Sequence, residues 1–76
     1  MAKPLSAKIV IKILCKKFGF SFVSQKGSHI KLEKMVHGKQ IITIIPNYKE
    51  LSNGTLKGIL GLAEITEKEF REKLKF

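Results

Sequence analysis

The chain has 76 residues, of which 43% are apolar, and 15 Lys and Arg against 6 Asp and Glu give it a net charge of +9. This length predicts one domain over residues 1–76 and excludes a second core or a bundle of membrane helices. The apolar fraction excludes a disordered chain.

The positive charge is concentrated in one part of the sequence. Residues 1–49 hold ten Lys and one acid, whereas residues 50–76 hold five Lys or Arg and five Glu. Such a field attracts a polyanion, with nucleic acid as the first candidate and an anionic membrane surface or an acidic protein behind it. The apolar run over residues 9–15 is interrupted by Lys12 and is too short to span a bilayer. We therefore expect a cytoplasmic protein without a membrane-spanning segment, and of the candidate partners we favour nucleic acid over a membrane surface.

Few side chains in the sequence could hold a metal ion. Cys15 is the one cysteine, so the chain has no internal disulfide, as is typical of a reducing compartment. We expect its side chain to be a small buried hydrophobe. The two histidines, the cysteine and the acids show no recurring ligand spacing. The sequence predicts neither a metal site nor a cofactor.

The first predicted element is a helix over residues 5–18, with Ser6 as its N-cap and Gly19 at its end. Its predicted apolar face consists of Ile9, Val10, Ile13 and Leu14. Lysines recur every four residues on the opposite side, where they are either solvated or follow a phosphate backbone. They are Lys8, Lys12 and Lys16.

An antiparallel meander is predicted next, with short turns that use Gly where a positive φ is needed. Its three strands cover residues 20–25, 29–35 and 40–45. Pro46 ends the third strand because it has no N–H to donate. The aromatic residues at the first strand are expected in the core. They are Phe18, Phe20 and Phe22.

Two short helices complete the chain. The first follows a cap at Ser52 or Asn53 and shows apolar residues at helical spacing up to Ala63. The second begins at a capping box of Thr66 and Glu69 and reaches toward Leu74. This order predicts an α+β fold in which the helices pack on one face of a three-stranded antiparallel sheet and the other face is open.

The chemically notable residue is a histidine that directly follows a glycine turn. In the second predicted strand, Ile30 and Leu32 alternate with His29 and Lys31, so His29 shares the solvent face with charged residues. Histidine transfers protons near neutral pH, and cleavage of a phosphodiester needs that ability together with cations. A solvated strand residue is the plainer interpretation of His29.

His37 lies too far along the hairpin, by roughly 25 Å at about 3.3 Å per residue, to work with His29 in one site. We expect it at a turn tip. Tyr48 follows the third strand, where its phenol either reaches a phosphate or covers the core.

Several segments together resemble the HicA family of mRNA interferase toxins. They are residues 26–32 (KGSHIKL), 37–38 (HG), 44–46 (IIP), 53–60 (NGTLKGIL) and 65–70 (ITEKEF). The resemblance extends over nearly the whole chain. It implies a fold like that of the double-stranded-RNA-binding domain, cleavage of mRNA, and neutralisation by a HicB-like antitoxin through which the protein could assemble. It assigns the family's essential histidine to His29.

The resulting hypothesis is a metal-independent endoribonuclease. His29 acts as general base on a ribose 2′-OH or as general acid on the leaving 5′-oxygen, with Lys26 or Lys31 offsetting the charge on phosphorus. The second proton carrier is open: Tyr48, a lysine, water or a residue of another subunit. The expected RNA contacts are Lys26, Gly27, Ser28, Lys31, Tyr48, Lys8 and Lys12.

Two alternatives belong to other functional classes. A non-catalytic RNA-binding module, or an inactive relative, would use the same basic surface through phosphate contacts and release no product. An interaction protein would dock an acidic partner on its lysine-rich face. Because such a partner would compete with RNA, we expect the two to exclude each other.

Overall fold

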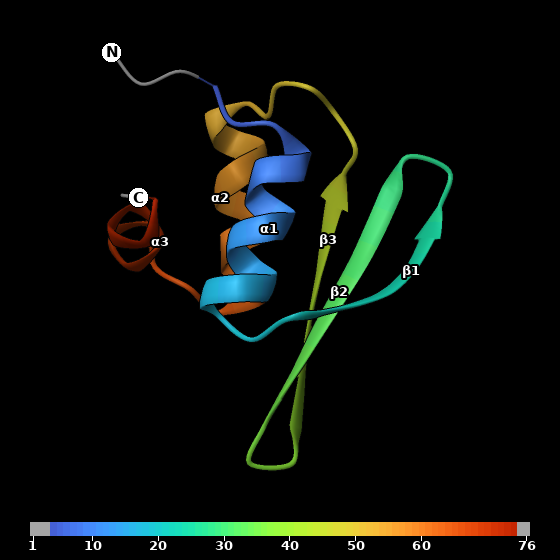
Figure 1. The fold of residues 1–76 in the computed structure, drawn as a ribbon, viewed down its shortest axis with the longest axis vertical. Coiled ribbons are helices and arrows are strands. Elements are labelled where there is room, and N and C mark those ends of the chain that lie inside the picture. Colours follow the sequence, from blue (N-terminus) through green and yellow to red (C-terminus); the bar gives the residue numbers. More distant parts are fainter. Residues whose placement is uncertain (1–3, 75–76) are drawn as a thin grey trace.

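A computed structural model describes residues 4–74. Its elements, drawn in Figure 1, are α1 (Ala7–Lys17), β1 (Ser21–Lys26), β2 (His29–Val36), β3 (Lys39–Pro46), α2 (Asn53–Ala63) and α3 (Glu67–Lys73). The strands form one antiparallel sheet in the order β1-β2-β3. This confirms the predicted α+β class and the order of its elements.

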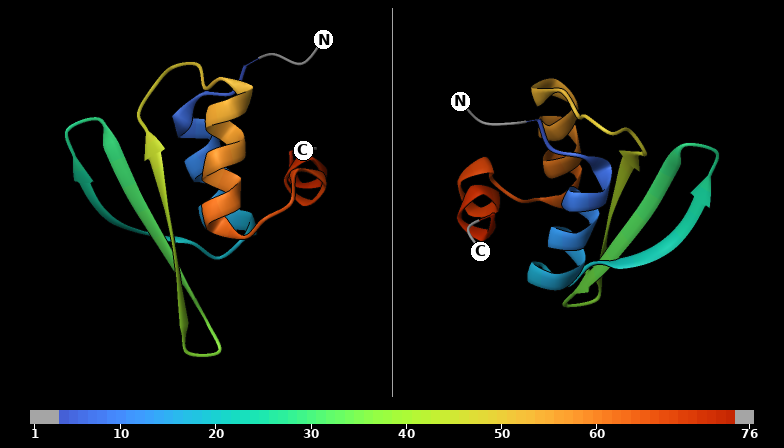
Figure 2. Two further views of the ribbon diagram at one scale, coloured as in Figure 1. Left: turned by 180° about the vertical axis from the view of Figure 1, so that it is seen from behind. Right: turned by 45° about the horizontal axis from the view of Figure 1, so that its top comes forward.

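The helices lie on one side of the sheet. α1 and α2 form the layer next to it, and α3 lies beside them on the side away from the strands (Figure 2). The opposite face of the sheet is open, as predicted. β2 pairs with β3 along its whole length, from His29 opposite Pro46 to Val36 opposite Lys39. β1 pairs with β2 through a bulge between Phe22 and Ser24.

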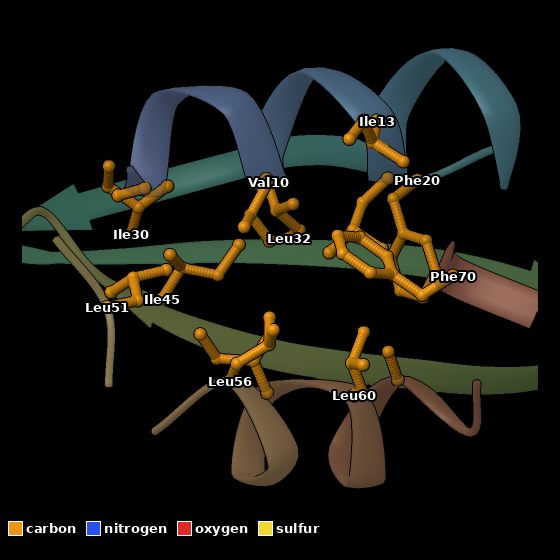
Figure 3. Packing of buried hydrophobic residues seen from close by; sticks show 14 of the residues in the cluster. Val10, Ile13, Phe20, Ile30, Leu32, Ile45, Leu51, Leu56, Leu60 and Phe70 are labelled. Atoms are coloured by element: carbon orange, nitrogen blue, oxygen red, sulfur yellow. The ribbon is translucent and has the colours of Figure 1, made fainter. Parts of the chain in front are cut away.

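The core fills the space between the sheet and the two inner helices. Alternate residues of β2 and β3 point into it and meet apolar side chains of α1 and α2 (Figure 3). Phe20 and Phe70 join the same cluster, the second from α3. The buried Thr43 hydroxyl donates a hydrogen bond of 2.8 Å to the Ile59 carbonyl, so this polar group is satisfied.

Side-chain caps begin all three helices. The Ser6 hydroxyl accepts from the Ile9 N–H, and the Ser52 hydroxyl accepts from the Thr55 N–H, so Ser52 and not Asn53 is the cap of α2. Thr66 and Glu69 form the predicted capping box, in which each side chain accepts from the other residue's backbone N–H. These caps satisfy donors that the first turn of a helix leaves free.

Three sequence predictions at the N-terminal half are wrong. Leu5 precedes α1 and forms a β-bridge with Leu51, whose N–H donates to the Leu5 carbonyl at 2.8 Å. Ile9 is 41% exposed, because Ala7 belongs to the buried stripe of α1 and shifts its centre away from Ile9. Phe22 is 60% exposed, because β1 lies beyond the area that the helices cover. Cys15 packs against the core but is only half-buried, so the prediction of a small buried hydrophobe is confirmed only in part; burial raises the pKa of its thiol.

The capping box makes part of the stability depend on pH. Hydrogen bonds from the backbone and side chain of Thr66 lower the pKa of the Glu69 carboxyl. The charge of Glu69 therefore stabilises the fold above the ordinary pKa of a glutamate, and this contribution is lost as the pH falls through the lowered pKa.

Replacing Glu69 by Gln should lower the free energy of unfolding near neutral pH, and the difference from the native chain should shrink in acid. Urea denaturation at roughly pH 7 and pH 3 measures this change. Glu72→Gln, an exposed position on the same helix, is the control and should show no comparable convergence. A Glu69→Gln difference that is independent of pH would contradict the assignment.

Candidate functional site

The turn between β1 and β2 sets the position of His29. Gly27 has a φ of 60° and occupies the first central position of a two-residue hairpin turn, where a type II′ turn needs a positive φ. His29 is the first residue of β2, directly opposite Lys26 on β1. The side chain is exposed, as the alternation of β2 predicts, because its neighbour Ile30 is buried.

Two hydrogen bonds hold this turn. The Gln25 Nε2 donates to the Gly27 carbonyl at 3.0 Å, and the backbone N–H of Asn47 donates to the Ser28 carbonyl at 2.6 Å. The second bond joins the turn to the segment that follows β3. The sequence analysis missed Gln25 and Asn47, and only the closeness of Asn47 to the Pro46 strand end hints at its role.

The open face carries two cations near His29. Paired residues of neighbouring strands share a face, so Lys26 lies beside His29, while Lys31 follows His29 by two residues on the same side. Lys31 is half-buried between Ser24 of β1 and Ile44 of β3. The site is therefore an exposed end of the sheet with positive charge around one histidine. A long anionic polymer can reach such a site.

The start of α1 lies at the same end of the molecule. The Ala7 N–H donates to the Tyr48 carbonyl at 2.9 Å, which joins the first turn of α1 to the segment after β3. Tyr48 is 54% exposed, so its phenol does not cover the core. Lys8 is next to this contact, and Lys12 is exposed one turn further along α1.

The structure divides the lysines among the predicted RNA contacts into two groups. Lys26 and Lys31 belong to the open face, whereas Lys8 and Lys12 belong to the helix on the opposite side of the sheet (Figure 1). The two groups flank the strand end that carries His29. A ligand that contacts both groups must therefore pass around that end of the sheet.

The cations of this region have no acidic partner within the described chain. Among residues 4–74, the ion pairs connect Glu64 with Lys39, at 2.9 Å, and Glu67 with Lys57 and Arg71. All three lie away from the residues that surround His29. The positive charge at the site is thus not neutralised internally and remains available to a polyanion.

His37 occupies the opposite end of the hairpin from His29. It has a φ of 50° and forms, with Gly38 at 80°, the two-residue turn between β2 and β3. Both values are positive, as a type I′ turn requires. The predicted turn-tip location is confirmed. Within residues 4–74, no three His, Cys, Asp or Glu side chains gather as a metal site would need. No described helix has the length and apolar character to cross a bilayer.

The fold and the site together define a small basic α+β domain with an exposed histidine at a cationic strand end. The family model of the HicA toxin of bacterial toxin-antitoxin systems matches residues 7–65. The chain therefore belongs to the HicA toxin family, which in general comprises ribonucleases and forms one half of a toxin-antitoxin pair. A comparison with curated proteins found no match. The matched range contains α1, the sheet and α2, and α3 lies beyond it.

The positive φ of Gly27 allows a test of how His29 is positioned. A Cβ at Gly27 or at Gly38 would meet no atom within 4 Å, so Ala at either position is strained by backbone conformation and not by contact. Each Gly→Ala exchange should lower the free energy of unfolding by about 1–3 kcal/mol. Only Gly27→Ala should shift the NMR signals of the His29 ring, and Gly38→Ala should shift those of His37. Unchanged His29 signals in Gly27→Ala would show that the turn does not position this side chain.

Proposed function

We propose that the protein is an mRNA-cleaving endoribonuclease toxin, active in the cytoplasm and neutralised by a HicB-like antitoxin. The observation that carries this proposal is the exposed His29, held at a fixed turn with Lys26 beside it and Lys31 on the same face. Membership of the HicA family supports it. His29 is the catalytic residue of the proposal, and the step needs no metal ion or cofactor because imidazole itself can carry the proton.

The proposed reaction is a transesterification within the RNA chain. A base removes the proton of a ribose 2′-OH, the 2′-oxygen forms a bond to the adjacent phosphorus, and the bond to the 5′-oxygen breaks as that oxygen accepts a proton. His29 performs one of the two proton transfers. Lys26 and Lys31 stabilise the extra negative charge on the phosphate oxygens in the transition state.

Tyr48 is the described candidate for the second proton transfer. The segment that carries it is tied to the His29 turn through Asn47 and to α1 through the Tyr48 carbonyl. Its phenol is exposed and can donate a hydrogen bond. A lysine, water or a residue of another subunit would serve as alternatives in the same step.

The remaining predicted contacts would hold the RNA. The backbone groups of Gly27 and Ser28 and the side chains of Lys8 and Lys12 lie around the same end of the sheet, on both of its sides. Contacts of this kind are made to phosphates, so they supply affinity without sequence selection. A strand of RNA that passes around the end of the sheet would bring one phosphate to His29.

One observation favours a binding module without catalysis as a second candidate. Of the two histidines, only His29 belongs to this end of the sheet, and two proton transfers normally use two groups. A chain that binds RNA through the same lysines and never cleaves it would share every geometric feature described above. RNA cleavage, and not RNA binding, therefore distinguishes the endoribonuclease from the binding module.

Replacing His29 by Ala should abolish RNA cleavage, because the proton carrier is removed, while RNA affinity changes little. The measurement is incubation of a labelled mRNA with each purified protein in excess chelator, followed by gel electrophoresis. His37→Ala is the matched control and should cleave like the native chain, because His37 lies at the far turn. Cleavage by His29→Ala would disprove its role. Intact RNA with all three proteins, together with binding, would establish the non-catalytic module.

Exchange of Lys8 and Lys12 for Ala should weaken RNA binding and reduce its salt dependence. For single-stranded RNA, the slope of log affinity against log salt should become shallower by about 0.7 for each phosphate that the variant no longer neutralises. Lys68→Ala is the control, because it removes one exposed charge from α3, which lies on the side of the helix layer away from the sheet and from the proposed RNA path (Figure 2), and it should leave the slope unchanged. Equal effects of all three substitutions would mean that net charge alone, and no defined contact, attracts the RNA.

A further inference from the structure

β1 has a free edge, and the proposed RNA site uses only its last residue, Lys26. β1 pairs only with β2, since the sheet order is β1-β2-β3, and all six of its residues are exposed. About half of the backbone N–H and C=O groups of such an outer strand point away from its neighbour. β3 is the other outer strand, but α2 packs along it, and the Thr43 hydroxyl bonds to α2.

Two adjacent exposed side chains of β1 are large and apolar. Phe22 is 60% exposed and the adjacent Val23 is 42% exposed, whereas Phe20, two residues earlier, is buried. Residues 21–25 carry no charge, and Lys26 at the end of the strand is its one cation. Phosphate recognition relies on cations, so this part of β1 suits a protein chain better than RNA.

The charge of the molecule indicates what kind of chain would bind there. A second copy would bring another net charge of +9, all of which lies, as in the first, in residues 1–49, which include β1. Repulsion between two such surfaces opposes self-pairing, whereas a partner of net negative charge would be attracted to the lysines around the sheet. The charge of this chain therefore favours an acidic protein as the occupant.

We propose that β1 is a docking edge for the antitoxin, which adds an extended strand of an acidic chain to the sheet and packs an apolar side chain on Phe22. This inference rests on the antitoxin partnership in the proposed function, and it adds the surface and the mode of binding. Main-chain hydrogen bonds supply affinity in this mode, and the contact with an exposed aromatic ring supplies specificity. Because β1 ends at Lys26, opposite His29, the added strand would extend toward the catalytic end.

The test uses the full chain and, as the candidate antitoxin, the product of the reading frame that neighbours its own. Phe22→Ser should weaken antitoxin binding about tenfold or more, as loss of an anchor residue does. Leu62→Ser removes an apolar side chain that is similarly exposed, at 56%, but lies on α2, and should leave the affinity unchanged. Hydrogen exchange of the native chain should show that antitoxin binding protects amides of β1. Without antitoxin, Phe22→Ser should cleave RNA like the native chain.

Three results would overturn the proposal. They are an unchanged affinity in Phe22→Ser, an equal loss in Leu62→Ser, and the absence of added protection in β1. Impaired RNA binding by Phe22→Ser with unchanged antitoxin affinity would assign the edge to RNA instead. The cleavage assay separates this inference from the proposed function: a native chain that never cleaves RNA, yet binds antitoxin through Phe22, would disprove the enzyme and retain the docking edge.

Discussion

The burial of alternate residues of β2 beneath α1 and α2 is the constraint on which the site depends. Ile30 and Leu32 lie in the core, so the residues between and before them must face the opposite side of the sheet. A slip of one residue would bury His29 and expose Ile30, at the cost of an unpaired polar group in the core. The two-residue turns at both ends of β2 fix the register against such a slip.

The same packing separates the unpaired lysines near His29 from the part of the chain in which positive and negative charges balance. The acids that form ion pairs in the described chain, Glu64 and Glu67, belong to the region of α2 and α3, where the charges of residues 50–76 balance. The lysines around His29 gain no such partner, so they contribute little to folding. Their mutual repulsion is tolerated because they lie on two sides of the sheet and are exposed to water.

Local patterns predicted much of this structure from the sequence. The capping box of Thr66 and Glu69, the Ser6 cap and the exposure of His29 follow from short-range chemistry and from alternation, and all three are observed. The burial of Phe22 was wrongly predicted because it depends on how far the helices extend over the sheet, which periodicity does not contain. The burial of Ile9 was wrongly predicted because the small residue Ala7 belongs to the buried stripe and moves its centre away from Ile9. The hydrogen bond from Asn47 to the turn and the division of the lysines between two faces likewise arise only when the chain is folded.

The position of Phe70 has a consequence for how the domain is delimited. Its ring is 1% exposed and belongs to the core, although α3 lies outside residues 7–65, which the family model matches. Loss of a buried Phe side chain costs about 3–5 kcal/mol, which is comparable with the whole stability of a chain this small. The segment recognised as the family is therefore smaller than the unit that folds, and a fragment cut at residue 65 would expose an unfinished core.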